Sequence, residues 1–162
     1  MENSASGNAV SLPAMGLVEG LGEDDRRLLA GYGCCRTVRN GEVVIEQGAS
    51  QESLHFVLAG SLHAKRTEGG REILLGEIRT GEWFGEVNIF DPGEASATVR
   101  AASQSEIWSI DRPGIEDFLN VRPLAGTAVL VGIATLLSRR LRGVTARLVG
   151  KSEYAALLGE LG

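Results

Sequence analysis

The sequence predicts a mainly β protein: a double-stranded β-roll of the jelly-roll type with flanking helices, followed by a long C-terminal helix. From about residue 37 to residue 110, short runs of alternating apolar and polar residues are separated by turn residues, which is typical of half-buried strands. The 22 glycines with only four prolines favour many tight turns over disorder. After Pro113 the apolar spacing becomes that of a helix.

The chain divides into three parts on this pattern. Residues 1–16 are small, polar and without periodicity, so we expect a loose N-terminal arm. Residues 17–122 would form the β-roll with short helices, the first of them over residues 21–32 with acidic residues in its first turn. Residues 123–162 would form the C-terminal helix and a tail. A chain of 162 residues suits one such domain.

Two β-hairpins are expected inside the roll. Residues 53–66 predict the first, because apolar positions alternate along it and Ala59-Gly60 supplies a turn. Residues 67–72 predict the second, since Gly69-Gly70 suits a tight loop that needs positive φ. Further strands are expected over residues 72–78, 97–101 and 106–110.

A short helix over residues 114–120 should precede the long one, which begins near Pro123. Along the long helix, apolar residues repeat at intervals of four and three: Leu130, Ala134, Leu137, Leu141, Val144 and Leu148. This stripe could pack on the protein's own sheet. Its narrow spacing favours a coiled coil with a second copy, so we predict a homodimer through residues 130–148. Gly132, Gly143 and Gly150 should weaken this helix.

Composition narrows the function classes. A net charge of −5 argues against non-specific nucleic-acid binding, which needs a basic surface. The longest apolar run, residues 128–137, is too short to span a bilayer, and the N-terminus does not resemble a signal peptide. Cys34 and Cys35 lack metal-site spacing and are expected to be reduced thiols. We therefore expect a cytoplasmic protein that does not enter a membrane.

The segment "FGEVNIFDPGEASATVRA", residues 84–101, has the form of a phosphate site. A helix N-terminus presents unpaired N–H groups, and Gly85 allows the backbone to come close to a ligand. Glu86 could accept a hydrogen bond from a ribose hydroxyl, while the backbone of residues 86–88 and the Ser96 hydroxyl could hold a phosphate. Alternatively, Glu86 is only a helix-start carboxylate and Gly85 a turn glycine, and the residues alone leave both interpretations open.

Three segments carry a resemblance to a known family: "GEVVIEQGASQESLHFVLAGSLHAKR" (41–66), "GEWFGEVNIFDPGEASATVRA" (81–101) and "SEIWSIDRPGIEDFL" (105–119). Together they resemble the cyclic-nucleotide-binding domain, the β-roll of catabolite-activator-type regulators, cyclic-nucleotide-gated channels and kinase regulatory subunits. The resemblance extends from about Leu17 to Leu148.

The resemblance implies that residues 84–99 form the family's phosphate-binding cassette, in which Glu86 holds the ribose 2′-hydroxyl. Thr145 on the long helix is our candidate for contacting a purine edge. The ligand-binding residues it implies are Phe84, Gly85, Glu86, Val87, Asn88, Ala95, Ser96, Ala97 and Thr98 in the cassette, with Arg140, Val144 and Thr145 on the helix.

Ala95 occupies the position of the family's phosphate arginine. Loss of a hydrogen bond to a charged group weakens binding by roughly 10- to 100-fold. Arg140, Arg142 or Arg147 could supply the missing charge, or could form a solvated helix face. The resemblance therefore implies a cyclic nucleotide, cAMP or cGMP, that binds weakly or atypically, with no cofactor required.

Other chemistry has less support in the sequence. His55 and His63 could face each other across the first hairpin, but we expect surface strand histidines and no metal site, because no further ligands stand at matching positions. There is no nucleophile–base pair, so we expect no enzyme. About a dozen residues follow Gly150, too few for a helix-turn-helix, so we expect no DNA binding by the chain itself.

Two hypotheses follow from these observations. In the first, the protein is a ligand sensor. Ligand binding in the roll would reposition the C-terminal helix and change how the dimer presents itself to an unknown protein partner. In the second, it is a degenerate roll that has lost its nucleotide and serves as a dimerisation or docking platform. Glu86 favours the first hypothesis and Ala95 the second. An intermediate possibility is that the roll binds a phosphate-bearing ligand of another kind, such as a cyclic dinucleotide.

Overall fold

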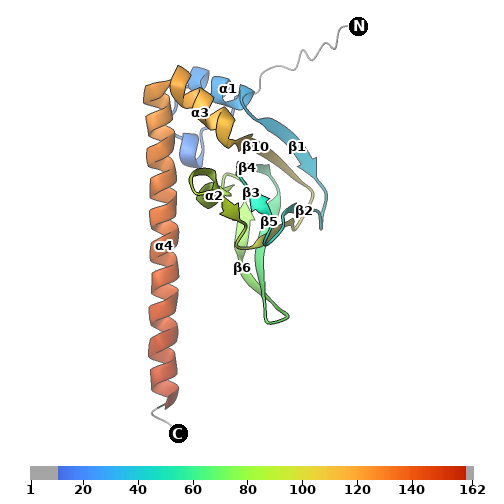
Figure 1. The fold of residues 1–162 in the computed structure, drawn as a ribbon, viewed down its shortest axis with the longest axis vertical. Helices are drawn as coiled ribbons and strands as arrows, with labels where there is room; N and C mark the ends of the chain where they lie inside the picture. The colour runs from blue at the N-terminus through green and yellow to red at the C-terminus, as the bar shows by residue number, and fades with distance from the viewer. Residues whose placement is uncertain (1–10, 160–162) are drawn as a thin grey trace.

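The computed structural model describes residues 11–159, with side chains as far as Lys151. It shows a β-roll packed beside a long C-terminal helix whose distal part extends past the roll (Figure 1). The mainly β fold with a long terminal helix is as predicted. The helical elements are η1 (Gly16–Val18), α1 (Glu23–Gly31), α2 (Glu86–Phe90), α3 (Arg112–Val121) and α4 (Pro123–Gly159).

Two four-stranded antiparallel sheets form the roll. The first has the order β1 (Cys34–Val38), β10 (Ser105–Asp111), β4 (Ser53–Ala59), β7 (Trp83–Phe84). The second has the order β2 (Val43–Ile45), β9 (Thr98–Ala101), β5 (Ser61–Glu68), β6 (Arg71–Arg79). A two-stranded ribbon pairs β3 (Ser50–Gln51) with β8 (Gly93–Glu94).

The predicted hairpin over residues 53–66 is wrong, although both of its strands exist. β4 and β5 belong to different sheets and do not pair with each other. Gly60 joins them with φ at 91°, and a Cβ there would overlap the Ser105 side chain. This glycine takes the chain from one sheet into the other, which an alternating pattern alone does not reveal. The second hairpin is confirmed: Glu68 pairs with Arg71 across Gly69 and Gly70, both at positive φ.

Two apolar clusters hold the roll together. One lies between the first sheet and the helices, around Phe56, Trp83, Trp108 and Phe118. The other lies between the two sheets and includes Val57, Leu62, Phe84, Ala95 and Ile107. Residues of β4 contribute to both clusters, so the strand is buried on both faces.

The N-terminal arm differs from expectation at its end. Leu12 is buried in the first cluster, and its carbonyl accepts a hydrogen bond from Arg26 Nε at 2.8 Å. The expected loose arm over residues 1–16 therefore does not describe this part of the chain. Residues 1–10 and 160–162 of the expected arm and tail lie outside the described residues.

Helix α4 packs on the roll mainly through residues outside the predicted stripe, of which Leu137 alone packs against the first cluster, half-buried, among the described residues. Ala125, Val129 and Ile133 are buried in the first cluster, whereas Leu141 is 68% exposed and Leu148 62% exposed. The predicted stripe is thus largely free on this single chain.

Two glycines of α4 mark close contacts with neighbouring elements. A Cβ on Gly132 would lie 3.2 Å from the Leu17 carbonyl oxygen, and one on Gly126 would lie 2.5 Å from Leu119 Cδ2. The helix-weakening effect expected of Gly132 therefore accompanies tight packing of α4 against η1.

By length and composition alone, the stretch Pro123–Lys151 of α4 could cross a membrane, contrary to what the shorter run 128–137 predicts. This is weak evidence, because the core helix of a soluble protein passes the same test. Part of the stretch packs against the roll through Val129 and Ile133.

Candidate ligand-binding site

A glycine turn between β7 and α2 places the candidate site. β7 pairs with β4, so that Phe84 lies opposite His55. Gly85 follows with φ at 85° as the N-terminal cap of α2, and a Cβ on it would overlap the Ser53 carbonyl oxygen. Only glycine fits such a left-handed position without strain. The turn therefore fixes Glu86 at the first position of α2.

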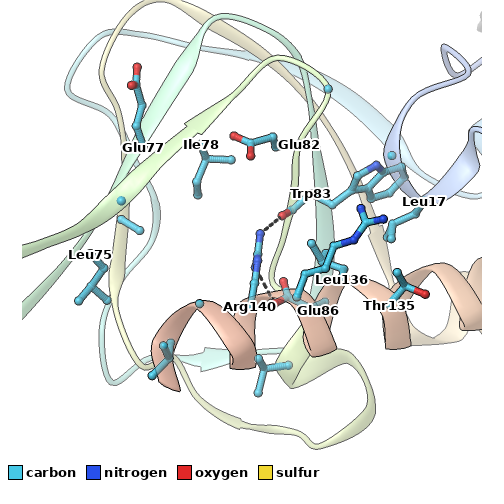
Figure 2. A pocket seen from close by; sticks show the side chains of 18 of the residues that line it. Leu17, Leu75, Glu77, Ile78, Glu82, Trp83, Glu86, Thr135, Leu136 and Arg140 are labelled. Atoms are coloured by element: carbon cyan, nitrogen blue, oxygen red, sulfur yellow. Dashed lines mark hydrogen bonds and ion pairs between the residues drawn. The ribbon is translucent and has the colours of Figure 1, made fainter. Parts of the chain in front are cut away.

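Glu86 is buried, with 3% of its surface exposed, and pairs with an arginine from α4. Arg140 Nη1 donates to Glu86 Oε1 at 2.5 Å, and Arg140 Nη2 donates to the Trp83 carbonyl oxygen at 2.5 Å (Figure 2). Within the described residues, Glu86 Oε2 and the indole N–H of Trp83 find no hydrogen-bond partner. Buried polar atoms are nearly always paired, so an acceptor left free at a cavity is an available binding group.

Two cavities share Glu86 and Arg140 in their walls. The smaller, about 180 Å³, lies over the cassette, and we call it the cassette pocket. The larger, about 870 Å³, lies between the roll, η1 and α4. The cassette pocket is lined by Ile45, Gln51, Ala64, Leu75, Ile78, Phe84, Gly85, Glu86, Val87, Asn88, Ala95, Ser96, Ala97, Val99 and Arg140.

Most of the predicted site residues come together in this region. Those that line the cassette pocket are Phe84, Gly85, Glu86, Val87, Asn88, Ala95, Ser96, Ala97 and Arg140. Val144 lines the larger cavity, as does Arg147. Thr98 and Thr145 line neither cavity. Thr98 Oγ1 accepts from the Gln47 N–H at 3.1 Å, and Thr145 Oγ1 donates to the Leu141 carbonyl oxygen at 3.0 Å.

Ala95 is held firmly in the wall of the cassette pocket. It is buried, its N–H donates to the Ala49 carbonyl oxygen, and its own carbonyl oxygen accepts from the Gly48 N–H, both at 2.8 Å. Of the described residues that line this pocket, Arg140 alone carries a positive charge. The wall of the pocket around Ala95 therefore has no cation of its own.

His55 supports the cassette from behind, a role that the sequence did not predict. It is buried and stacks on Phe84 with ring centroids 4.8 Å apart. Gln51 Nε2 donates to His55 Nε2 at 3.0 Å, so the ring is the tautomer whose Nδ1–H donates to Ser109 Oγ at 2.7 Å. Burial lowers the pKa of His55 to about 4, and the charge of Arg36 adds to this effect.

The expected surface position of His55 is wrong, whereas His63 lies half-buried on β5. His55 is not a surface residue, and it does not face His63 across a hairpin, because β4 and β5 lie in different sheets. A signal for its burial lies in Leu54, Phe56 and Val57, which make β4 apolar on both faces. Among the described residues, no group of three or more His, Cys, Asp or Glu side chains could hold a metal ion.

A β-roll that carries a glycine-turn cassette, with a buried glutamate under a C-terminal helix, defines a class of regulatory ligand-binding domain. The model of the cyclic nucleotide-binding domain family matches residues 35–122, more than half of the chain. The protein belongs to the cyclic nucleotide-binding domain family, and the resemblance seen in the sequence is confirmed.

Relatives and solved structures agree with this membership. The cyclic AMP receptor protein of Thermus thermophilus is 32% identical over 127 residues, which cover 78% of this chain and 57% of the relative. The cAMP-activated global transcriptional regulator CRP of Salmonella typhimurium is 29% identical, covering 73% of this chain and 55% of the relative. The crystal structure of the Thermus thermophilus catabolite activator protein superposes with a TM-score of 0.74 at 31% identity, covering 82% of this chain and 61% of that one. This chain thus spans a little over half the length of the curated relatives it matches.

Proposed function

We propose that this chain is a non-enzymatic sensor module that binds a cyclic-nucleotide-like ligand in the cassette pocket and signals through α4 as a homodimer. The observation that carries the proposal is Glu86: a buried carboxylate at a cavity wall, with one oxygen that has no hydrogen-bond donor among the described residues. Burying such a group costs free energy unless it is paired, and a ligand hydroxyl would supply the missing bond.

The same glutamate would couple the ligand to the helix. Arg140 of α4 donates to Glu86, so a ribose hydroxyl that binds Glu86 competes with Arg140 or adds to its contact. Either event changes how firmly α4 is held against the roll. A ligand shifts this equilibrium only by its difference in affinity for the two helix positions, and Glu86 gives that difference a physical origin.

The exposed stripe of α4 supports the homodimer. Leu141 and Leu148 lie on the surface one heptad apart, and two copies of such a stripe can pack as a coiled coil. Sedimentation of the purified protein should show a dimer, and Leu141→Glu should give a monomer because it places a charge in the apolar contact. Glu116→Lys, on the exposed surface of α3, serves as the control. A monomeric wild type would contradict this part of the proposal.

Isothermal titration with cAMP and cGMP tests ligand binding by wild type and by Glu86→Gln. We expect weak binding by wild type, with roughly 10- to 100-fold lost in Glu86→Gln because the carboxylate acceptor becomes a neutral amide. Asp91→Asn, which changes an exposed carboxylate next to α2, should bind as wild type does. Equal affinities for wild type and Glu86→Gln would show that the carboxylate has no role in binding.

The degenerate platform is the second candidate, and Ala95 together with the Arg140–Glu86 pair favours it. In that case Arg140 permanently fills the position that a ligand hydroxyl would take. A folded dimer that binds no nucleotide or nucleoside at millimolar concentration would establish this function, and an unidentified protein partner would then carry the output.

A further inference from the structure

The wall of the cassette pocket around Ala95 is apolar. Ile45, Ala95 and Val99 are buried there, and Ala97 lies beside them in the same wall. An anion placed against such a surface loses its hydration and gains no countercharge, which is costly. This wall of the pocket therefore suits an uncharged group better than a phosphate.

The two arginines that contact the cassette pocket are already engaged, while Arg139 and Arg147 line only the larger cavity. Arg140 uses Nη1 for Glu86 and Nη2 for the Trp83 carbonyl oxygen. Arg66 Nη1 donates to the Ser96 carbonyl oxygen at 3.0 Å from outside, and Arg66 lines neither cavity. A phosphate could recruit Arg140 only by removing it from Glu86, which would leave a buried carboxylate without its cation.

The remaining polar groups suit hydroxyl and amide chemistry. Glu86 Oε2 has no donor among the described residues, and Oε1 accepts from Arg140. Because each carboxylate oxygen can accept more than one hydrogen bond, the group can still accept from both hydroxyls of a vicinal diol. Gln51, Asn88 and Ser96 line the same pocket as neutral donors and acceptors. Beyond Glu86 the larger cavity of about 870 Å³ continues to Val144 on α4, which leaves room for a planar base.

We propose that the ligand of this site is an uncharged ribonucleoside, whose free 2′ and 3′ hydroxyls donate to Glu86 and whose sugar 5′ side lies against the apolar wall at Ala95. This inference deepens the proposed sensor function and rests on it. A cyclic nucleotide has its 3′ oxygen in the phosphodiester, so it offers Glu86 one hydroxyl and brings an anion to the apolar wall.

Isothermal titration of the full chain with adenosine, guanosine, cAMP and cGMP decides between the two ligand classes. We expect one nucleoside to bind at least tenfold more tightly than its own cyclic nucleotide, and 2′-deoxyadenosine or 2′-deoxyguanosine to lose at least tenfold relative to that nucleoside. Cyclic nucleotides that bind as tightly as the nucleosides would overturn this inference and leave the sensor function standing. Binding of none of the four would overturn both.

Ala95→Arg tests the cause directly. It should raise the affinity for the cyclic nucleotide roughly 10- to 100-fold by adding a charged hydrogen bond. It should not raise the nucleoside affinity, because a nucleoside brings no anion to the new cation. Ala59→Arg adds the same charge at an exposed position that lines neither cavity and should change neither affinity. An unchanged ratio of affinities in a folded Ala95→Arg would overturn the argument. If that variant does not fold, the wild-type series still decides.

Discussion

Acidification should destabilise the protein through His55. The pKa of this buried ring is about 4 in the folded state, against an ordinary value of 6.5. Between these two pKa values the unfolded chain binds more protons than the folded one. The free energy of unfolding therefore falls as the pH drops from about 6.5 to about 4, and the full contribution of His55 is present above that range. The cause is local: protonation would turn Nε2 into a donor that faces the Gln51 amide, which already donates to it.

The size of the effect follows from the two pKa values. The two pKa values imply that keeping His55 neutral contributes about 3 kcal/mol to the free energy of unfolding. About 2 kcal/mol of this contribution is lost between pH 7 and pH 5. That is a large share of the stability of an ordinary domain, about 5–15 kcal/mol. Glu42 and Glu72, whose pKa values their cationic or backbone partners lower, are exposed, and they contribute equally in a variant that lacks only His55.

Urea unfolding followed by tryptophan fluorescence measures this loss, since Trp83 and Trp108 are both buried. Wild type should lose about 2 kcal/mol more than His55→Gln between pH 7 and pH 5. His63→Gln removes the other histidine, which is half-buried, and should follow wild type. If His55→Gln and wild type lose the same stability, the ring is not held neutral and the proposed hydrogen-bond chain is wrong.

Three further variants test the geometry of the site. Gly85→Ala should destabilise the fold by more than about 1 kcal/mol, because φ is 85° and the methyl group meets the Ser53 carbonyl oxygen; a normal melting temperature would refute that conformation. Arg140→Ala should lower the free energy of unfolding in urea by about 1–3 kcal/mol, less than for a fully buried pair because Arg140 is partly exposed. Adding Glu86→Gln to the same chain should restore part of that stability. Thr145→Ala should leave ligand affinity within about twofold, since its hydroxyl bonds back to the helix; a larger loss would mean that α4 turns on binding.

The sequence predicts local features of this fold well and distant pairings poorly. Gly69-Gly70 forms a tight turn because two residues at positive φ decide its shape, and neighbouring residues suffice to predict that. Gly60 also turns the chain, yet β4 pairs with β10 and β5 with β9, strands that lie far along the sequence, so neighbouring residues do not predict this pairing. Alternation of side chains records burial and carries no information about which sheet a strand joins.

In the candidate site too, the sequence predicts the features that neighbouring residues decide and misses those that depend on distant residues. Residues 84–88 and 95–97 line one pocket because a single glycine turn and the short loop between β8 and β9 bring them there. The burial of His55 depends on its neighbours Phe84 and Ser109, and each belongs to another strand. Arg140 and Glu86 lie 54 residues apart in the chain, and the sequence offered Arg140 only as one of three arginines that could replace the missing phosphate charge, so it did not predict this pair.

In the proposed sensor, the bond from Arg140 to Glu86 would make ligand binding and helix position interdependent. Among the ion pairs of the described residues, Arg140–Glu86 is the one with a buried partner, while the others join side chains that are at least about a third exposed and contribute little. A ligand that loosens Arg140 changes the restraint on α4, and coupling free energies are reciprocal. If the proposed dimerisation through the exposed face of α4 depends on this restraint, it changes ligand affinity by the same factor by which the ligand changes dimerisation. Measuring the dimer dissociation constant with and without saturating ligand, in wild type and in Arg140→Ala, should show a shift that disappears when the arginine is removed.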